Sequence, residues 1–279
     1  MITVKTYGGL ANRMRVIDSA YQVSKLTGHE LQVRWEISYE LNCSFFKLFE
    51  PVQLFDVREY FIHKYNKKFI SLLTKTAKKF GINLPAGYDT HIFNDEIEHA
   101  KESNTIPELF GNPGEIYLRT VHQFQTAEDS FVYFKPIREL NEKILQYRER
   151  FTANTVGIHI RRSDNILSIK NSPREAFVSE MQKSIVNDPE TVFFLATDSP
   201  EEEKFLQHTF PGRIISTTKE LSRDSEKGIQ DALVDLYCLA STHRIVGSFY
   251  SSFSEVAAQI SNIPLELINI DPVTNQKIL

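Results

Sequence analysis

The segment that decides the fold is Thr155-Val156-Gly157-Ile158-His159-Ile160-Arg161-Arg162-Ser163-Asp164. Its apolar run ends in two arginines, a small polar residue and an acid, which is typical of a buried strand that carries charge to its carboxyl end. Because side chains alternate along a strand, His159 and Arg161 should share one face and Arg162 the other. A guanidinium offers a planar fork of donors to phosphate oxygens, so the segment predicts a site for an anion such as a pyrophosphate. The alternative is a strand-end arginine paired with a surface acid.

Patterns typical of strands and helices alternate on both sides of this segment. Such alternation predicts βαβ units and a largely parallel sheet, whose carboxyl edge is where open α/β sheets bind ligands. The 279 residues exceed the usual domain size of about 150, so we expect two lobes, 1–152 and 153–279. Further strands are expected at 2–6, 30–35, 115–124, 192–196, 213–216 and 243–247, and helices at 14–26, 137–151, 172–187, 201–210, 229–241 and 253–261.

The composition is that of an ordinary soluble globular protein, with 41% hydrophobic and 24% charged residues. A net charge of -4 argues against a general nucleic-acid binder, which needs a basic surface. Cys43 and Cys238 lie far apart and have no metal-type spacing, so neither a disulfide framework nor a zinc site is indicated. No stretch resembles a signal peptide or a spanning helix, and a cytoplasmic location is expected.

A basic amphipathic pattern covers residues 64–80, where six lysines surround phenylalanine and leucine at helical spacing. One interpretation is a solvated helix whose apolar side packs on the core. The other is a helix that rests on an anionic membrane surface, which would make the protein peripheral to the membrane.

A glycine turn, Tyr7-Gly8-Gly9-Leu10-Ala11-Asn12-Arg13, follows the first expected strand and precedes a helix. Glycine lets the backbone approach a ligand closely, and the amides at a helix N-terminus suit an anion. The spacing is neither a dinucleotide fingerprint nor a Walker loop. A plain tight turn is the alternative.

Two more polar clusters follow expected strands, namely Thr197-Asp198-Ser199 and the serine loop Ser248-Phe249-Tyr250-Ser251-Ser252-Phe253-Ser254. Hydroxyls and amides at a helix start suit phosphate oxygens, although serine also commonly caps helices. Asp235 borders the apolar side of its helix and therefore needs a partner. A guanine edge with adjacent N–H donors would serve, and an ion pair with Arg244 or His243 is the alternative.

These clusters, in order along nearly the whole chain, resemble the motifs of the fucosyltransferase superfamily, which includes α-1,2-, α-1,6-, nodulation and protein O-fucosyltransferases. The segments that carry the resemblance are Gly8 to Arg13, His159 to Asp164, Ala196 to Ser199, Asp235, and Ser248 to Ser254. The glycine turn departs from the α-1,2 branch, which has Gly and Gln where this chain has Ala11 and Arg13. The linkage and the acceptor therefore stay open.

The resemblance implies a GT-B fold, with two Rossmann-like lobes, parallel sheets and a ligand cleft between them. It also implies inverting transfer from GDP-fucose without an obligatory metal or other cofactor. By position, Arg161 would clamp the β-phosphate, His159 and Asp235 would contact the nucleoside, and Ser251, Ser252 and Phe253 would hold phosphates. The remaining residues assigned to the site are Gly9 and Asn12 from the first lobe, Arg162, Asp164 and Asp198.

Inverting transfer also needs a base for the acceptor hydroxyl, and Asp164, Glu36 and Asp18 are the candidates. The predicted function is transfer of fucose from GDP-fucose to a hydroxyl of a glycan acceptor, as in polysaccharide biosynthesis. The alternatives are another nucleotide-sugar donor on the same fold, or a nucleotide-sugar-binding protein without turnover.

Overall fold

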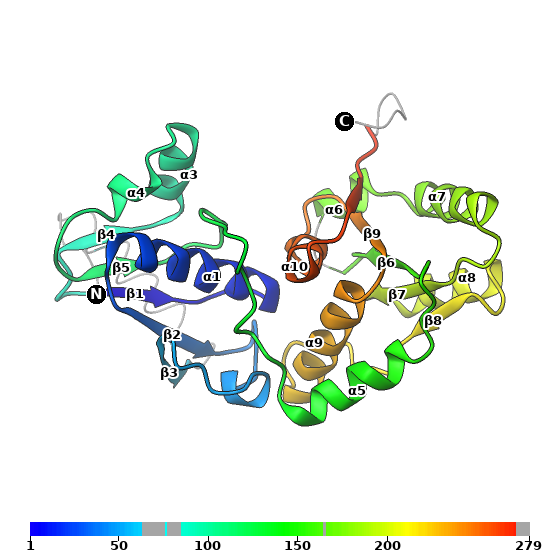
Figure 1. Ribbon diagram of the computed structural model, residues 1–279, viewed down its shortest axis with the longest axis horizontal. Helices are drawn as coiled ribbons and strands as arrows, with labels where there is room; N and C mark the ends of the chain where they lie inside the picture. Colours follow the sequence, from blue (N-terminus) through cyan, green and yellow to red (C-terminus); the bar gives the residue numbers. More distant parts are fainter. Residues whose placement is uncertain (63–75, 77–84, 164–165, 272–279) are drawn as a thin grey trace. The chain divides into compact units, whose positions relative to one another are not determined.

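A computed structural model describes residues 1–62, 76, 85–163 and 166–271, and the chain divides into two compact units (Figure 1). Unit 1 comprises Met1–Ile137 and Ser222–Gln230, and unit 2 comprises Arg138–Leu221 and Asp231–Leu279. The division after Ile137 differs from the expected one after residue 152, because helix α5 (Arg138–Arg148) belongs to unit 2, where the Tyr147 hydroxyl accepts a hydrogen bond from Thr218 N at 3.0 Å. Asp164 and the basic segment 64–80, apart from Thr76, lie outside the described residues.

Unit 1 is built on a parallel five-stranded sheet of order β3-β2-β1-β5-β4. Its strands are β1 (Ile2–Lys5), β2 (Leu31–Ile37), β3 (Asp56–Phe61), β4 (Thr90–Ile92) and β5 (Ile116–Leu118), and its helices are α1 (Leu10–Thr27), η1 (Phe45–Lys47), α3 (Asn94–Glu102) and α4 (Ile106–Leu109). The strands expected at 2–6 and 30–35 and the helix expected at 14–26 are confirmed. The strand expected at 115–124 covers only β5, and β3 and β4 were not expected.

Unit 2 has a second parallel five-stranded sheet, of order β10-β9-β6-β7-β8. Its strands are β6 (Val156–Ile160), β7 (Phe193–Thr197), β8 (Ile214–Ser216), β9 (Arg244–Ser248) and β10 (Leu265–Ile268), and its helices besides α5 are α6 (Ile166–Asn171), α7 (Arg174–Asn187), α8 (Pro200–Thr209) and α10 (Ser252–Ser261). Helix α9 (Glu226–Ala240) belongs to unit 2 from Asp231 onward, and its first residues, up to Gln230, belong to unit 1. The strand order is that of a doubly wound nucleotide-binding unit, in which the direction of winding reverses between β6 and β9. Ligands bind such sheets at that switch point, beyond the carboxyl ends of the strands.

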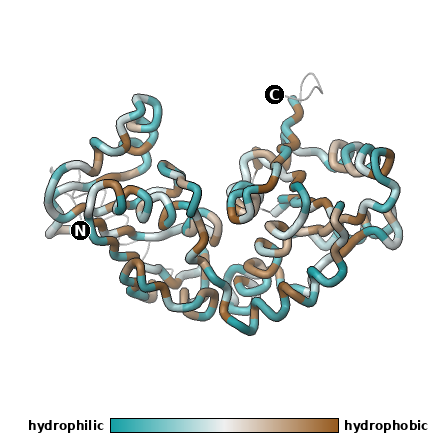
Figure 2. Tube along the Cα trace, viewed as in Figure 1, coloured by the Kyte–Doolittle hydropathy of each residue, from teal (hydrophilic) through white to brown (hydrophobic). Residues whose placement is uncertain are grey.

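The predicted alternation along β6 is confirmed. Ile158 and Ile160 are fully buried in a core cluster that contains Phe177 of α7. On the opposite face, the ring of His159 stacks on Phe253 of α10. The helices themselves alternate between hydrophilic and hydrophobic residues (Figure 2), as expected when one face of each is buried. None of the helices within the described ranges is long and apolar enough to cross a membrane.

Gly247 allows α10 to approach β9 closely. A Cβ built at Gly247 would lie 2.6 Å from both Cβ and Oγ of Ser254, which is closer than side-chain atoms pack. We expect Gly247→Ala to destabilise unit 2 by about 1–3 kcal/mol through overpacking. The measurement is urea unfolding followed by circular dichroism.

The matched control is Gly111→Ala, whose added methyl would meet its nearest neighbours at an ordinary 3.5 Å. An unchanged unfolding midpoint in Gly247→Ala would mean that α10 can move away from β9 without loss of packing.

Candidate functional site

The carboxyl end of β6 is joined to the ends of β7 and β9. The amide of Arg161 donates to Ser248 Oγ at 3.0 Å, and the Arg161 guanidinium lies 3.0 Å from Asp198 Oδ2. Asp198, which directly follows β7, also accepts hydrogen bonds from Arg162 N at 2.7 Å and Ser163 Oγ at 2.6 Å. The polar residues that follow these three strands therefore lie together at the carboxyl edge of the sheet.

Asp198 is the centre of this arrangement. Burial opposes its ionisation, but the charge of Arg161 and the hydrogen bonds from Ser163 and Arg162 outweigh burial and lower the pKa of the carboxyl. A carboxylate held in the charged form fixes both the backbone of the arginine turn and the Arg161 side chain. Asp198 thus positions Arg161, and its predicted contact with substrate stays a prediction.

Arg162 points to the other face of the sheet, as the alternation predicted. Its Nε lies 2.8 Å from Glu202 Oε1, and a terminal nitrogen donates to Ser172 O at 3.0 Å. The other oxygen of Glu202 lies 2.8 Å from Arg174 Nε, at the start of α7. These contacts brace the loop that follows β6, and they favour a structural role for Arg162 over the predicted substrate contact.

The serine loop between β9 and α10 leaves the first turn of α10 without a side-chain cap. Ser251 occupies the N-cap position, but its side chain makes no capping hydrogen bond, so capping does not explain this serine. Tyr250 has a φ of 55°, in the left-handed region that non-glycine residues seldom adopt. Backbone strain of this kind clusters at functional turns. The α10 N-terminus thus presents amides at the switch point, where an anion would bind.

Ser172 lies just before α7 but does not cap it. Pro173 occupies the N-cap position of α7. The Ser172 hydroxyl instead donates to Ile268 O at 2.6 Å and accepts from Phe249 N at 2.8 Å. It therefore anchors the serine loop to β10.

His159 lies beside Arg161 and is only 5% exposed. Its ring stacks on Phe253, with centroids 5.0 Å apart, and its Nδ1 is buried without a hydrogen-bond partner in the part of the chain that the structure describes. Burial, reinforced by the charge of Arg161, lowers the pKa of His159 to about 3. The imidazole is therefore neutral at physiological pH and can both donate and accept one hydrogen bond.

The lowered pKa of His159 predicts a pH-dependent stability. An unfolded histidine titrates near 6.5, so below that pH the unfolded chain binds a proton that the native protein does not. The contribution of neutral His159 to the free energy of unfolding is therefore complete above pH 6.5. As the pH falls towards 3, this free energy decreases by up to about 1.4 kcal/mol per pH unit. Urea unfolding of wild type and His159→Gln at pH 7.5 and 5.0 should show a smaller loss in the variant, by about 2 kcal/mol.

The control is His208→Gln, on the exposed end of α8, which should keep the wild-type pH dependence. Equal pH dependence in wild type and His159→Gln would show that native His159 takes up the proton.

Asp235 on α9 is buried and already has partners. Its two oxygens contact Thr217 Oγ1 and Lys219 Nζ, the latter at 2.6 Å. The predicted alternative partners, Arg244 and His243, are wrong, because both lie at the amino end of β9, where Arg244 pairs with Glu180 and Glu266. Burial raises the pKa of Asp235, and Lys219 opposes this shift. Lys219 was not expected at the site; the only sequence signal was a lysine shortly after a strand end.

The glycine turn of unit 1 is held by Arg13. The buried Arg13 donates from Nε to Gly8 O at 2.9 Å and stacks over Trp35. Gly9 is the N-cap of α1, and Asn12 Oδ1 is buried without a hydrogen-bond partner among the described residues. Arg13, which stands where the α-1,2 branch has Gln, thus has a structural role. The predicted contacts of Gly9 and Asn12 with the nucleotide sugar stay predictions.

Two of the three candidate bases are buried in unit 1. Asp18 accepts hydrogen bonds from Phe131 N at 2.8 Å and Tyr133 Oη at 2.7 Å, which gives it a structural role. Glu36 is 1% exposed, and its carboxylate lies 3.9 Å from Lys5 Nζ. Asp164 lies outside the described residues. Within the described ranges, no three or more His, Cys, Asp or Glu side chains are grouped to hold a metal ion.

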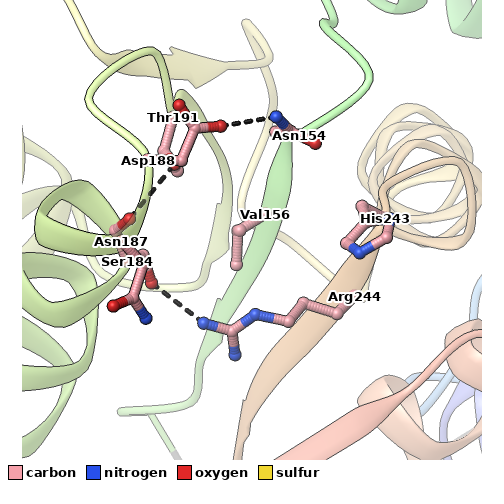
Figure 3. Close-up of a pocket in the computed structure, with 8 residues that line it drawn as sticks. All are labelled: Asn154, Val156, Ser184, Asn187, Asp188, Thr191, His243 and Arg244. Carbon is pink, nitrogen blue, oxygen red and sulfur yellow. Dashed lines mark hydrogen bonds between the residues drawn. The ribbon is translucent and has the colours of Figure 1, made fainter.

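A pocket lies at the opposite, amino edge of the unit 2 sheet (Figure 3). Asn154 bonds to Asp188, and Arg244 bonds to Ser184 Oγ at 2.9 Å. Parallel sheets bind ligands at their carboxyl edge, so this pocket is not the candidate site. Its lining residues are Asn154, Val156, Ser184, Asn187, Asp188, Thr191, His243 and Arg244.

Comparison with known proteins finds no family model and no curated sequence that matches, but it finds similar solved structures. NodZ α-1,6-fucosyltransferase soaked with GDP-fucose has a TM-score of 0.66 at 20% identity, over 99% of this chain and 96% of that chain. Arabidopsis thaliana FUT1 in complex with GDP has a TM-score of 0.60 at 14% identity, over 95% and 69%. POFUT1 in complex with GDP-fucose has a TM-score of 0.54 at 10% identity, over 97% and 98%. These likenesses show that the chain has the fold of fucosyltransferases, with two Rossmann-like units.

Proposed function

We propose that this chain is a glycosyltransferase that binds GDP-fucose at the carboxyl edge of the unit 2 sheet and transfers fucose to a hydroxyl of a glycan. The observation that carries the proposal is the placement of Arg161 and the uncapped start of α10 on the two sides of the β6/β9 switch point. The shared fold supports it, because the similar structures include complexes of fucosyltransferases with GDP or GDP-fucose.

The chemistry of these groups suits the departure of GDP. Cleavage of the fucosyl bond places negative charge on the β-phosphate, and a fixed guanidinium and helix amides stabilise that charge without reorganising. Arg161 and the amides of Ser252 and Phe253 supply these groups in our proposal, so no metal is required. Because Asp198 fixes Arg161 beforehand, the donors are already placed before the bond breaks.

His159 and Asp235 are proposed to contact the nucleoside. By strand alternation His159 shares the face of β6 with Arg161, and α9, which carries Asp235, packs on this face at Gly157. Neutral His159 can bond to a ribose hydroxyl without adding charge. Transfer is proposed to be inverting, with Asp164 as the base, since the carboxylates of Asp18 and Glu36 are buried in unit 1. The proposed setting is polysaccharide biosynthesis in the cytoplasm, with peripheral membrane contact through 64–80 left as a separate proposal.

A thermal-shift panel of GDP, UDP, ADP and CMP tests the donor. Stabilisation by GDP, followed by release of GDP from GDP-fucose with a glycan acceptor, would support the proposal. Preference for UDP would indicate a different nucleotide-sugar donor, and GDP binding with neither hydrolysis nor transfer across an acceptor panel would indicate a binding protein. Arg138→Ala, at an exposed surface ion pair, is the control for general loss of stability.

A further inference from the structure

We infer that Lys219 selects guanine over other bases by donating a hydrogen bond to the 6-oxo group of the nucleotide. The inference rests on the proposed function, because it assigns a specificity-determining residue to the same donor site. Its basis is the arrangement of Lys219 and Asp235 in unit 2.

The pair presents a fixed order of donors and acceptors. The Lys219 ammonium lies 2.6 Å from Asp235 Oδ2, and Thr217 Oγ1 bonds to Oδ1. The side chains of Lys219 and Asp235 are only 5% and 7% exposed, so both charges are largely removed from water. This row consists of a donor on Lys219 followed by two acceptors on Asp235. While charged, the ammonium can only donate hydrogen bonds and the carboxylate can only accept them.

Two elements carry the row, and a third carries the neighbouring His159. Lys219 lies in the loop after β8, Asp235 on α9, and His159 on β6. A Cβ built at Gly157 would lie 3.0 Å from a methyl carbon of Leu239 on α9, so α9 packs on the face of β6 that carries His159, and Asp235 lies one turn before Leu239 on that helix. His159 in turn stacks on Phe253 at the start of α10, where the phosphates are proposed to bind. The row therefore lies where the base of a bound nucleotide would reach.

The edge of guanine complements this row. It presents the O6 acceptor, then the N1–H donor, then the N2–H donor, so O6 would face Lys219 while both N–H groups face the carboxylate. Adenine presents a donor where guanine has O6 and an acceptor at N1, which would set donor against donor and acceptor against acceptor. Uracil matches at the first two positions, but its second carbonyl would face a carboxylate oxygen. Asp235 alone rejects uracil, whereas rejection of a base that lacks the 6-oxo acceptor requires Lys219.

The size of the effect follows from burial. A hydrogen bond to a charged group that is removed from water contributes about 1.5–3 kcal/mol, which corresponds to roughly 10- to 100-fold in affinity. Lys219 also neutralises Asp235, so its removal leaves a buried carboxylate without a counter-charge. The experiment must separate the selection of the base from the stability of the protein.

The probe is 6-thio-GDP, which keeps both N–H donors of guanine and replaces only O6 by sulfur, a weak acceptor. We expect the wild-type protein to bind GDP at least tenfold more tightly than 6-thio-GDP, measured by isothermal titration calorimetry. Lys219→Met should bring this ratio close to one, while Lys204→Met, at an exposed position of α8, should leave it unchanged. The double variant Lys219→Met/Asp235→Asn leaves no buried charge unpaired, and it should also show a ratio near one.

The outcomes are distinguishable. A wild-type ratio near one, or an undiminished ratio in either Lys219 variant, would overturn the inference and leave the proposed function standing. Lys219 would then only neutralise Asp235. If the wild-type protein binds none of the nucleoside diphosphates, the proposed function fails, and the inference fails with it.

Discussion

Arg161→Ala is expected to lower kcat/KM for fucose transfer by about 1,000-fold, the effect of removing a preorganised group that stabilises charge in the transition state. The guanidinium of Arg161 is held by Asp198 at 3.0 Å, and the amide of Arg161 is held by Ser248 at 3.0 Å. The loss should appear mainly in kcat, because the charge on the leaving phosphate develops as the bond breaks. Release of GDP from GDP-fucose with saturating donor measures it.

Arg161→Lys is the informative companion to this variant. A lysine keeps the charge but not the planar fork, so it should recover only part of the activity and not the whole of it. Arg138→Ala, at an exposed ion pair, should retain full activity. Wild-type turnover in Arg161→Ala would remove the basis of the proposed mechanism.

Asp198→Ala is expected to produce the second largest loss, about 100-fold in kcat/KM. The variant removes the acceptor for three donors of the arginine turn, namely Arg162 N, Ser163 N and Ser163 Oγ, and it frees the Arg161 side chain. Misplacing a group that stabilises the transition state by about 1 Å is enough for a loss of that size. Asp198→Asn keeps one acceptor oxygen but not the charge, and should lie between the alanine variant and wild type.

Positioning and direct contact can be separated by a double-mutant cycle. If Asp198 acts through Arg161, then Asp198→Ala should add little to the loss already caused by Arg161→Ala. Independent, additive losses would show that Asp198 itself contacts the substrate, as its place in the motif predicted. Urea unfolding of the Asp198 variants at pH 7.5 controls for general loss of stability.

The strand β6 and its two faces could be read from the sequence because the strand is central and buried on both sides. The near-continuous apolar run and its sudden change to charge were both visible. Strand β3 was missed because its segment Asp56–Phe61 is polar and half exposed, as befits an edge. Its alternation is weak, and only pairing with β2 makes it a strand.

The contacts that organise the site could not be predicted, because they join residues remote in sequence. The sequence around Arg162 does not predict that it pairs with Glu202, and the sequence around Asp235 does not predict that it pairs with Lys219. Asp235 was expected to have a partner, since a buried charge needs one. Which cation lies next to the acid depends on how the loops and helices pack on the sheet, and a single sequence does not specify this packing.

The segment Ser222–Gln230 belongs to unit 1, although it follows most of unit 2 in the chain. In unit 1 it is held by bonds such as that from Asn42 N to Arg223 O at 3.0 Å and that from Gln230 Nε2 to Lys47 O at 3.1 Å. During synthesis on the ribosome, unit 1 therefore stays incomplete until residue 230 has emerged. By then residues 138–221 of unit 2 have already been synthesised, so unit 1 cannot complete its folding before part of unit 2 is present. A nascent chain halted near residue 152 would lack this last segment and expose the surface that it covers.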